Sequence, residues 1–187
     1  MAILHTWSGN SIKIYDFTPM LKRTVTIDKS MKQGAASISH ANKIFIIGGW
    51  EPASDETYEV DVNKGKAIEK GLMLCKKGHA SFCQRYTEIY SIGGWNGSSL
   101  NDCEKYSIYL DRWSALPNLN TSVCELAAFM FNLHYIYAIC GFTNAASNIV
   151  EKLTLSENSK WEYITMTNPI PAVYNCLGEY RLAIIRQ

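Results

Sequence analysis

The fold is decided by Ile44-Phe45-Ile46-Ile47-Gly48-Gly49-Trp50, because this stretch occurs again as Ile89-Tyr90-Ser91-Ile92-Gly93-Gly94-Trp95. A weaker third copy reads Ile136-Tyr137-Ala138-Ile139-Cys140-Gly141-Phe142. The aromatic residue after the glycines moves from position 50 to 95 to 142, in steps of 45 and 47 residues. A recurring spacing of this size indicates a repeat protein, in which each repeat is one supersecondary unit.

A partial fourth copy lies at the start of the chain. A step of 43 residues back from Trp50 reaches Trp7, where His5-Thr6 replaces the glycine pair. The same step carries Tyr58 to Tyr15. Two matches at one offset predict that residues 1–33 belong to the same repeat.

Each copy contains the same parts in the same order. A strand of small and apolar residues comes first, as in Gly34-Ala35-Ala36-Ser37-Ile38 or Gly78-His79-Ala80-Ser81-Phe82. A short polar turn leads to the apolar strand that ends at the glycines. A third strand follows, containing Tyr106-Ser107-Ile108-Tyr109 in one copy, and then a fourth segment with Trp113 or Trp161. Short runs of β-branched and aromatic residues between turn formers predict strands, and no window has a sustained helical period. Four strands per repeat match one blade of a β-propeller.

The pattern resembles the kelch family, whose repeat joins an apolar strand ending in Gly-Gly to a downstream Tyr and Trp. Copy 78–123 has all four marks, copy 34–77 lacks the Trp, and copy 124–171 has Cys140 and Leu153 in place of a Gly and the Tyr. The structural repeat positions are Gly48, Gly49, Tyr58, Gly93, Gly94, Tyr106, Trp113, Gly141 and Trp161. The resemblance implies an all-β, kelch-type β-propeller, a fold that usually has six or seven blades in this family. Counting the repeats in this chain gives about four blades of four antiparallel strands, either a small propeller or part of a larger one.

The repeat boundaries predict one domain over residues 1–187. It consists of a partial blade at 1–33, blades at 34–77, 78–123 and 124–171, and a partial blade at 172–187. The two ends could complete one blade together and close a ring of four, which would remove exposed strand edges. Two other arrangements stay open: a fragment or open crescent finished by another chain, and two copies forming a larger ring.

Composition excludes several classes of partner. The 18 basic and 17 acidic side chains give a formal net charge of +1, so no electrostatic argument favours nucleic acid or an anionic membrane. No stretch approaches the ~20 apolar residues that span a bilayer. The N-terminus lacks the features of a secretory signal, and the six cysteines show no zinc-ligand spacing, so we expect a cytoplasmic protein with reduced thiols.

No catalytic residue, metal site or cofactor is predicted. The Gly-Gly pairs are followed by a strand, whereas a phosphate-binding loop needs a following helix. The four histidines, His5, His40, His79 and His134, share no metal-ligand spacing, although His79 is expected near the propeller axis. Asp55, Glu56, Asp102 and Glu104 precede the third strands at equivalent places, and recurring acidic residues there are typical of turn hydrogen bonding.

The loops after the second strands are the candidate binding elements, because they are polar, small and aromatic. The candidate binding residues are Trp50, Glu51, Trp95, Asn96, Ser98, Phe142 and Asn144. The sequence predicts a non-catalytic scaffold that binds a protein partner through these loops, with neither nucleic acid nor membrane as partner. The alternatives are a structural subunit of a large assembly that neighbouring chains complete, by self-association or by pairing of the incomplete end blades, and a propeller enzyme of the oxidase or isomerase type.

Overall fold

The computed structural model describes residues 4–17 and 20–174. Within these residues the chain forms fifteen β-strands and no helix, and therefore no helix that could span a membrane. The strands form four antiparallel sheets in chain order, one of three strands and three of four strands. We call the sheets blades 1 to 4. The predicted all-β, blade-by-blade architecture is confirmed.

The strand bounds follow the repeat. Blade 1 holds β1 (Leu4–Ser8), β2 (Ser11–Phe17) and β3 (Met20–Thr26). Blade 2 holds β4 (Ala36–His40), β5 (Lys43–Ile47), β6 (Thr57–Asp61) and β7 (Lys66–Glu69). Blade 3 holds β8 (Ser81–Arg85), β9 (Glu88–Ile92), β10 (Cys103–Ser107) and β11 (Arg112–Ala115). Blade 4 holds β12 (Ala127–Phe131), β13 (Tyr135–Ile139), β14 (Val150–Thr154) and β15 (Trp161–Tyr163).

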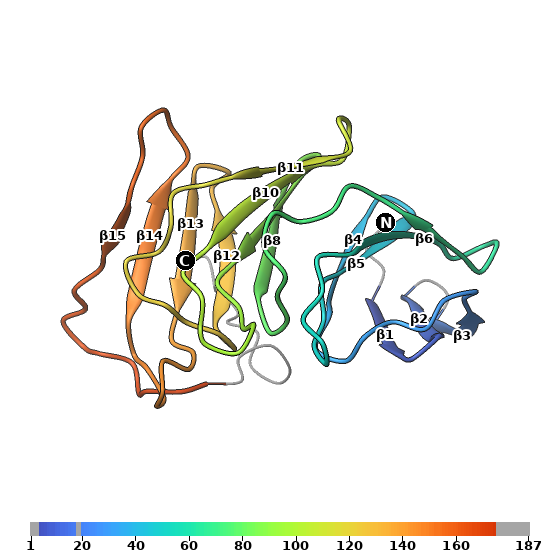
Figure 1. The fold of residues 1–187 in the computed structure, drawn as a ribbon, viewed down its shortest axis with the longest axis horizontal. Coiled ribbons are helices and arrows are strands. Elements are labelled where there is room, and N and C mark those ends of the chain that lie inside the picture. The colour runs from blue at the N-terminus through green and yellow to red at the C-terminus, as the bar shows by residue number, and fades with distance from the viewer. Residues whose placement is uncertain (1–3, 18–19, 175–187) are drawn as a thin grey trace.

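The four blades stand side by side in an arc, with blade 1 and blade 4 at its opposite ends (Figure 1). The first strands of successive blades, β4, β8 and β12, approach one another, whereas the fourth strands lie outward. The first strands therefore line the axis around which the blades are arranged.

The second strands of blades 2 and 3, β5 and β9, are buried on both faces, which explains their continuous apolar runs. In β5, Ile44 and Ile46 pack with Ile12 and Ile14 of blade 1. Phe45 and Ile47, on the other face of β5, pack with residues of blade 3 that include Tyr106. A third cluster joins blades 3 and 4; it consists of Cys83, Tyr90, Ile92, Cys103, Leu119, Val123, Leu126, Ile136, Ala138, Leu153 and Trp161. The period-two alternation of a strand thus supplies a core to both neighbouring blades.

The first strands begin later than the sequence predicted. β4 starts at Ala36 and β8 at Ser81, so Gly34 and His79 lie in the linkers that enter these strands. Both have a left-handed backbone, with φ of 68° and 53°, which no strand contains. The third strand of blade 3 also ends earlier than expected, at Ser107, and the next residues form the turn to β11.

The N-terminal copy differs from the others. Trp7 was expected in a loop beyond a strand, but it lies within β1, and only the two residues 9 and 10 separate β1 from β2. A tight hairpin here replaces the long loop of blades 2 to 4, because Gly9 has a left-handed φ of 56° where the glycine pair is missing.

The predicted strands after residue 171 fall mostly outside the described residues. Of this segment the structure describes 172–174, where Val173 pairs with Ser147 of blade 4. Val173 O accepts a hydrogen bond from Gly141 N, as the linker residue Val123 does from Gly94 N. The predicted pairing of 172–187 with 1–33 involves residues outside the described ones.

Candidate functional site

Antiparallel connectivity places two kinds of connection at the same end of every blade. The loops between second and third strands lie there (48–56, 93–102 and 140–149), together with the linkers that enter each new blade (27–35, 70–80 and 116–126). We call this end the loop face. The opposite end, the turn face, carries the short turns that follow each first and third strand.

Backbone hydrogen bonds fix the loops to the linkers. Trp95 N donates to Gly78 O at 2.8 Å, and Gly78 N donates to Trp95 O at 3.0 Å. One residue earlier, Gly94 N donates to Val123 O of the next linker, at 2.9 Å. Blade 4 repeats these bonds, and in blade 2 Trp50 N donates to Gln33 O while Gly49 N donates to Lys77 O. Each of these loops therefore holds both its own linker and the following one. The loop face is therefore a connected frame of backbone rather than a set of separate loops.

The glycine pair makes this close contact possible. Gly93 has a φ of 60°, and a Cβ added there would lie 2.4 Å from Val123 O. Glycine tolerates the left-handed conformation and leaves room for the approaching carbonyl. Cys140 occupies the same position in blade 4 and also has a φ of 59°. A third strand follows every pair, so the glycines serve blade contact.

Backbone hydrogen bonds join three residues that lie at equivalent positions of the linkers near the axis: Gly34, His79 and Glu125. His79 N donates to Gly34 O at 3.1 Å, and Glu125 N donates to His79 O at 3.0 Å. His79 Nδ1 lies 3.7 Å from Glu125 Oε1, and a Cβ on Gly34 would meet His79 Nε2 at 3.0 Å. The imidazole therefore lies over the glycine of one blade and beside the carboxylate of the next.

Two tryptophans complete an aromatic patch at this place. The Trp50 and Trp95 rings have centroids 6.3 Å apart at an interplanar angle of 70°. Trp50 also contacts the His79 ring, with centroids 6.5 Å apart. All three side chains, like that of Glu125, are only partly buried. We call Trp50, His79, Trp95 and Glu125 the axial patch. Its members come from blades 2, 3 and 4, up to 75 positions apart in the sequence.

The other candidate binding residues surround this patch on the loop face. Glu51, Asn96, Ser98 and Asn144 are exposed. Phe142 is partly buried and packs edge-on against Tyr174, with centroids 5.9 Å apart, so it belongs to the blade 4 side. The sequence analysis missed Glu125. It follows His79 at the repeat spacing, and this periodicity of the linkers was a usable signal.

Buried carboxylates tie the linkers to the third strands. Glu104 of β10, 2% exposed, accepts hydrogen bonds from Leu74 N at 2.6 Å and Cys75 N at 3.2 Å. Lys77 Nζ lies 3.0 Å from Glu104 Oε1, and its side chain is fully buried. Glu151 of β14 does the same for the next linker, accepting from Thr121 N and from Asn120. These carboxylates serve hydrogen bonding, as the sequence suggested for its recurring acids.

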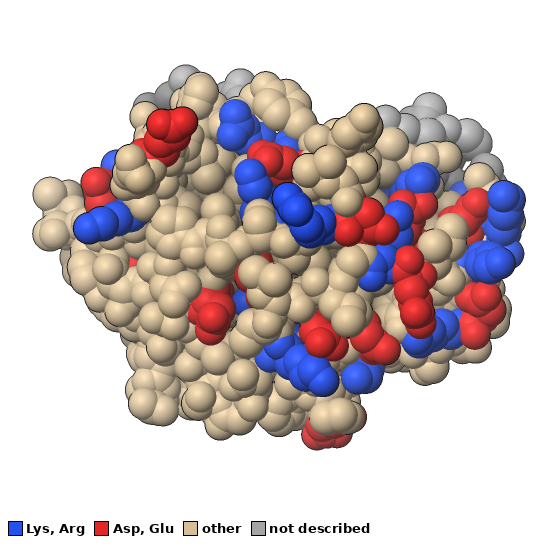
Figure 2. Space-filling view, turned by 45° about the horizontal axis from the view of Figure 1, so that its top comes forward, with Lys and Arg blue, Asp and Glu red and all other residues tan. Residues whose placement is uncertain are grey.

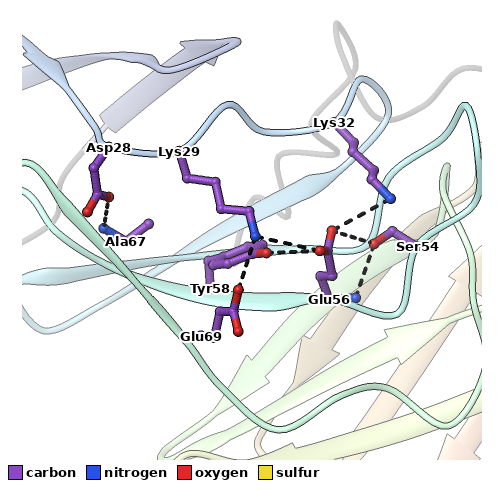
Figure 3. Close-up of polar contacts among 8 residues, drawn as sticks. All are labelled: Asp28, Lys29, Lys32, Ser54, Glu56, Tyr58, Ala67 and Glu69. Carbon is purple, nitrogen blue, oxygen red and sulfur yellow. Dashed lines mark hydrogen bonds and ion pairs between the residues drawn. The ribbon is translucent and has the colours of Figure 1, made fainter.

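Blade 2 holds its linker with a different set of side chains (Figure 3). Lys29 Nζ lies 3.1 Å from Glu69 Oε1, 3.6 Å from Glu56 Oε1 and 4.2 Å from the centre of the Tyr58 ring. The Tyr58 hydroxyl donates to Glu56 Oε1 at 3.0 Å. Strand register places Tyr58, and not Glu56, at the position of Glu104. A tyrosine and a lysine thus replace the carboxylate and backbone amides of blade 3.

These contacts shift two pKa values in opposite directions. The hydrogen bond with Tyr58, assisted by Glu69 and Glu56, raises the pKa of Lys29 despite some burial. Partial burial alone would raise the pKa of Glu56. Hydrogen bonds from Ser54 and Tyr58, together with the nearby lysines, instead hold that pKa below its ordinary value. Both groups are therefore charged near neutral pH, which keeps the linker attached.

The predicted position of the repeat's Tyr is wrong in blade 2. Tyr106 pairs with Ile89 and with Trp113, whereas the residue that pairs with Ile44 and Ala67 in blade 2 is Val60. The sequence analysis gave Tyr58 as the equivalent of Tyr106, but the strand register places Tyr58 two positions too early. Blade 2 therefore has a small pair, valine and alanine, where blade 3 has two rings.

The two tryptophans of the fourth strands are buried. The Tyr106 and Trp113 rings have centroids 5.2 Å apart. Trp113 Nε1 donates to Thr57 Oγ1 of blade 2 at 3.0 Å, and Trp161 Nε1 donates to Pro117 O at 2.9 Å. Each indole therefore reaches across toward the preceding blade. Among residues 4–17 and 20–174, no three His, Cys, Asp or Glu side chains are arranged to hold a metal ion.

The fold and its glycine-aromatic loops define a blade-type repeat protein. The family model described as the kelch motif matches residues 77–120, which span blade 3. Blade 3 therefore carries a kelch motif, and the chain as a whole resembles kelch-repeat proteins. It is 26% identical over 192 aligned residues to the Kelch repeat and BTB domain-containing protein 2 of Ectromelia virus, an alignment that covers 95% of this chain. The protein of the same name from Cowpox virus is 25% identical over 170 residues, or 84% of this chain. The chain spans about a third of the length of these relatives, 34% and 30% respectively.

Proposed function

We propose that this chain is a non-catalytic interaction module that binds a protein partner through its loop face. The observation that carries the proposal is the axial patch. Two tryptophans, a histidine and a carboxylate from three blades meet there, and they are only partly buried. Tryptophan is enriched among the residues that dominate binding energy at protein interfaces.

Rigidity supports the same proposal. The patch residues are attached to a frame of backbone hydrogen bonds that crosses from blade to blade, such as Glu125 N to His79 O. A preformed surface loses less conformational entropy when a partner binds, and affinity rises accordingly. The exposed loop residues around the patch, including Glu51, Asn96 and Asn144, supply polar groups for its rim.

The charge balance of the chain, 18 basic against 17 acidic side chains, favours a protein over a nucleic acid as the partner. On the face shown in Figure 2, basic and acidic side chains alternate over blades 1 and 2, and the surface over blade 4 carries few charges. Binding along a phosphate backbone would instead require a continuous basic surface. A surface that mixes both signs of charge, without a continuous basic stripe, suits a folded domain or a peptide.

The experiment compares capture by two matched double variants of the tagged full chain, in cells that express it. One variant changes the patch, Trp50→Ser with Trp95→Ser. The control changes two exposed apolar residues of the turn face, Tyr109→Ser with Leu110→Ser, which are 87% and 60% exposed. Circular dichroism and thermal unfolding establish that both variants fold.

We expect quantitative mass spectrometry to identify a partner that the control retains and the patch variant loses by at least about tenfold. A partner that survives the patch substitutions and is lost from the control variant would place the interaction on the turn face and refute the proposal.

A further inference from the structure

Blade 4 stands at one end of the arc, so only one of its two faces packs on another described blade (Figure 1). We call the opposite side its outer face. Strand register assigns to this face four aromatic residues that form two cross-strand pairs. The pairs are Phe129 with Tyr137 and Phe131 with Tyr135, and all four residues are only partly buried.

Three of these rings contact one another. The Phe129 and Tyr137 rings are stacked, with centroids 5.3 Å apart, and Phe131 meets Tyr137 edge-on, with centroids 6.1 Å apart. Leu133, in the turn between the same two strands, is 40% exposed. A group of aromatic and apolar side chains that are not fully buried is typical of an interaction surface.

The matching face of blade 3 is covered by its neighbour. Tyr90 lies three residues before Gly93, as Tyr137 lies three residues before Cys140. Tyr90 packs in the cluster that joins blades 3 and 4, and it is 1% exposed. The outer face of blade 4 therefore occupies the position of a contact between blades.

The composition of this face differs from that of its covered counterpart. Blade 3 has Arg85 opposite Glu88 at the cross-strand pair where blade 4 has Phe131 opposite Tyr135. Two aromatic rings thus replace two charged side chains. The outer face is therefore richer in aromatic residues than the face that blade 4 itself covers.

Blade 1, at the other end of the arc, does not offer a matching surface. Ile12 and Ile14 face blade 2, so the alternate residues of β2 and their partners on β3 face away from it. Among these, Lys13, Thr24 and Thr26 are exposed. A polar outer face is usual for a terminal, capping repeat. Packing blade 1 of the same chain or of another copy on blade 4 would set these polar groups against the aromatic rings.

Two residues of opposite charge flank the aromatic rings. Lys152 of β14 lies opposite Tyr137, and its Nζ is 5.6 Å from the centre of the Tyr135 ring. Glu162 of β15 lies opposite Lys152, with 3.4 Å between Nζ and Oε2. One cation and one anion make this face complementary in charge to a second copy of itself. A two-fold axis places the same patch on both sides of an interface, so a symmetric dimer requires this self-complementarity.

We propose that the chain forms a symmetric dimer in which the outer faces of two copies of blade 4 pack together. The aromatic rings of each copy cover those of the other, and the flanking charges of opposite sign face each other. The loops of blades 2 and 3 that carry Trp50 and Trp95 lie outside this interface. A dimer therefore presents two axial patches.

Sedimentation equilibrium of the full chain at a series of concentrations measures the association. We expect a limiting mass of twice the 21.1 kDa of one chain. The variant Phe131→Arg with Tyr135→Glu installs the pair that blade 3 carries at this position, which suits the hairpin. The control, Tyr109→Arg with Leu110→Glu, places the same two charges at exposed residues of the turn face.

Circular dichroism and thermal unfolding establish that both variants fold. We expect the blade 4 variant to raise the dissociation constant of the dimer at least about tenfold, because it sets charged groups in an apolar contact. The control should leave that constant unchanged.

A mixing experiment separates contacts between chains from contacts within one chain. Lys152→Glu gives the outer face two anions, and Glu162→Lys gives it two cations. We expect each variant alone to dimerise more weakly than wild type at low salt, because like charges then face each other. An equimolar mixture should regain the dimer, since the two faces are then complementary. Damage within a single chain would not be repaired by mixing.

A wild-type chain that stays monomeric at every concentration would overturn the proposal, and would point to residues 175–187 of the same chain as the cover of this face. A dimer that survives the blade 4 substitutions, or that the control substitutions weaken equally, would overturn it as well. So would a mixture of the two charge variants that is no more dimeric than either variant alone.

Discussion

Trp50 and Trp95 contact each other edge to face, with ring centroids 6.3 Å apart, although they follow the second strands of different blades. The sequence analysis predicted each as a candidate binding residue in its own loop, without a contact between the two. The repeat geometry brings both to the axis, because the loop of each blade is hydrogen-bonded to the linker of the next. Their contact joins the equivalent loops of blades 2 and 3 into one surface.

The two tryptophans should stabilise each other modestly. In a double-mutant cycle with Trp50→Leu and Trp95→Leu, we expect a coupling energy of about 0.5–1.5 kcal/mol, typical of an aromatic pair. Urea unfolding of the four proteins measures it. A coupling energy of zero would mean that the rings do not meet in solution.

Breaking the buried ion pair of blade 3 should be costly. Glu104→Gln leaves the Lys77 ammonium group buried without a counter-charge, so we expect a loss of about 3–5 kcal/mol in the free energy of unfolding. Glu151→Gln is the matched control, because its carboxylate has similar amide donors and no lysine. Denaturant unfolding should show a smaller loss for the control. Equal losses would contradict the assigned role of Lys77.

Adding Lys77→Met to Glu104→Gln should recover part of the lost stability, since the uncompensated charge is removed along with its partner. If the double variant is no more stable than Glu104→Gln alone, the cost arises from the linker amides and not from the ammonium group.

The first glycine of each pair should be sensitive to a single added methyl group. Gly93→Ala places a Cβ 2.4 Å from Val123 O, whereas in Gly9→Ala the nearest atom is 3.6 Å away. Both glycines have left-handed backbones, with φ of 60° and 56°, so both variants carry a backbone cost of about 1–2 kcal/mol. We expect Gly93→Ala to lose about 3 kcal/mol or more in all, measured by thermal and urea unfolding. Equal losses would show that the close contact between blades is absent.

The Glu56 network should make stability depend on pH. Its pKa is lowered by folding, so its contribution is fully present above the unfolded value of 4.5 and is lost as the pH falls through the lower, folded value. We expect wild type to lose its advantage over Glu56→Gln below about pH 4.5. Denaturant unfolding at a series of pH values measures this, with Glu157→Gln at an exposed turn as the reference. A constant difference across that range would contradict the network.

Sequence alone predicted the blade architecture because repetition of the Gly-Gly strand is strong evidence that does not depend on local propensity. It failed at Tyr58, because distance along the chain does not reveal the register between strands, and Val60 is the residue that faces Ala67. It also missed Glu125, whose role depends on a hydrogen bond to a different blade. Contacts between repeats depend on how the blades pack against one another, and the sequence of a single repeat does not specify that packing.

The linkers that enter blades 3 and 4 show the same limit. Only the hydrogen-bond register reveals that Lys77, which is buried against Glu104, and Val123 occupy equivalent positions. The candidate binding loops were identified from composition, and their arrangement around the axial patch required the structure.

Site-specific photo-crosslinking tests the proposed binding face most directly. A benzophenone side chain is placed at Asn96, exposed on the loop face, or at Tyr109, 87% exposed on the turn face. The proposal predicts a defined cross-linked partner from position 96 and none from position 109, with loss of the position 96 product when Trp50 is replaced by serine. A partner that cross-links from position 109 and not from position 96 would contradict it.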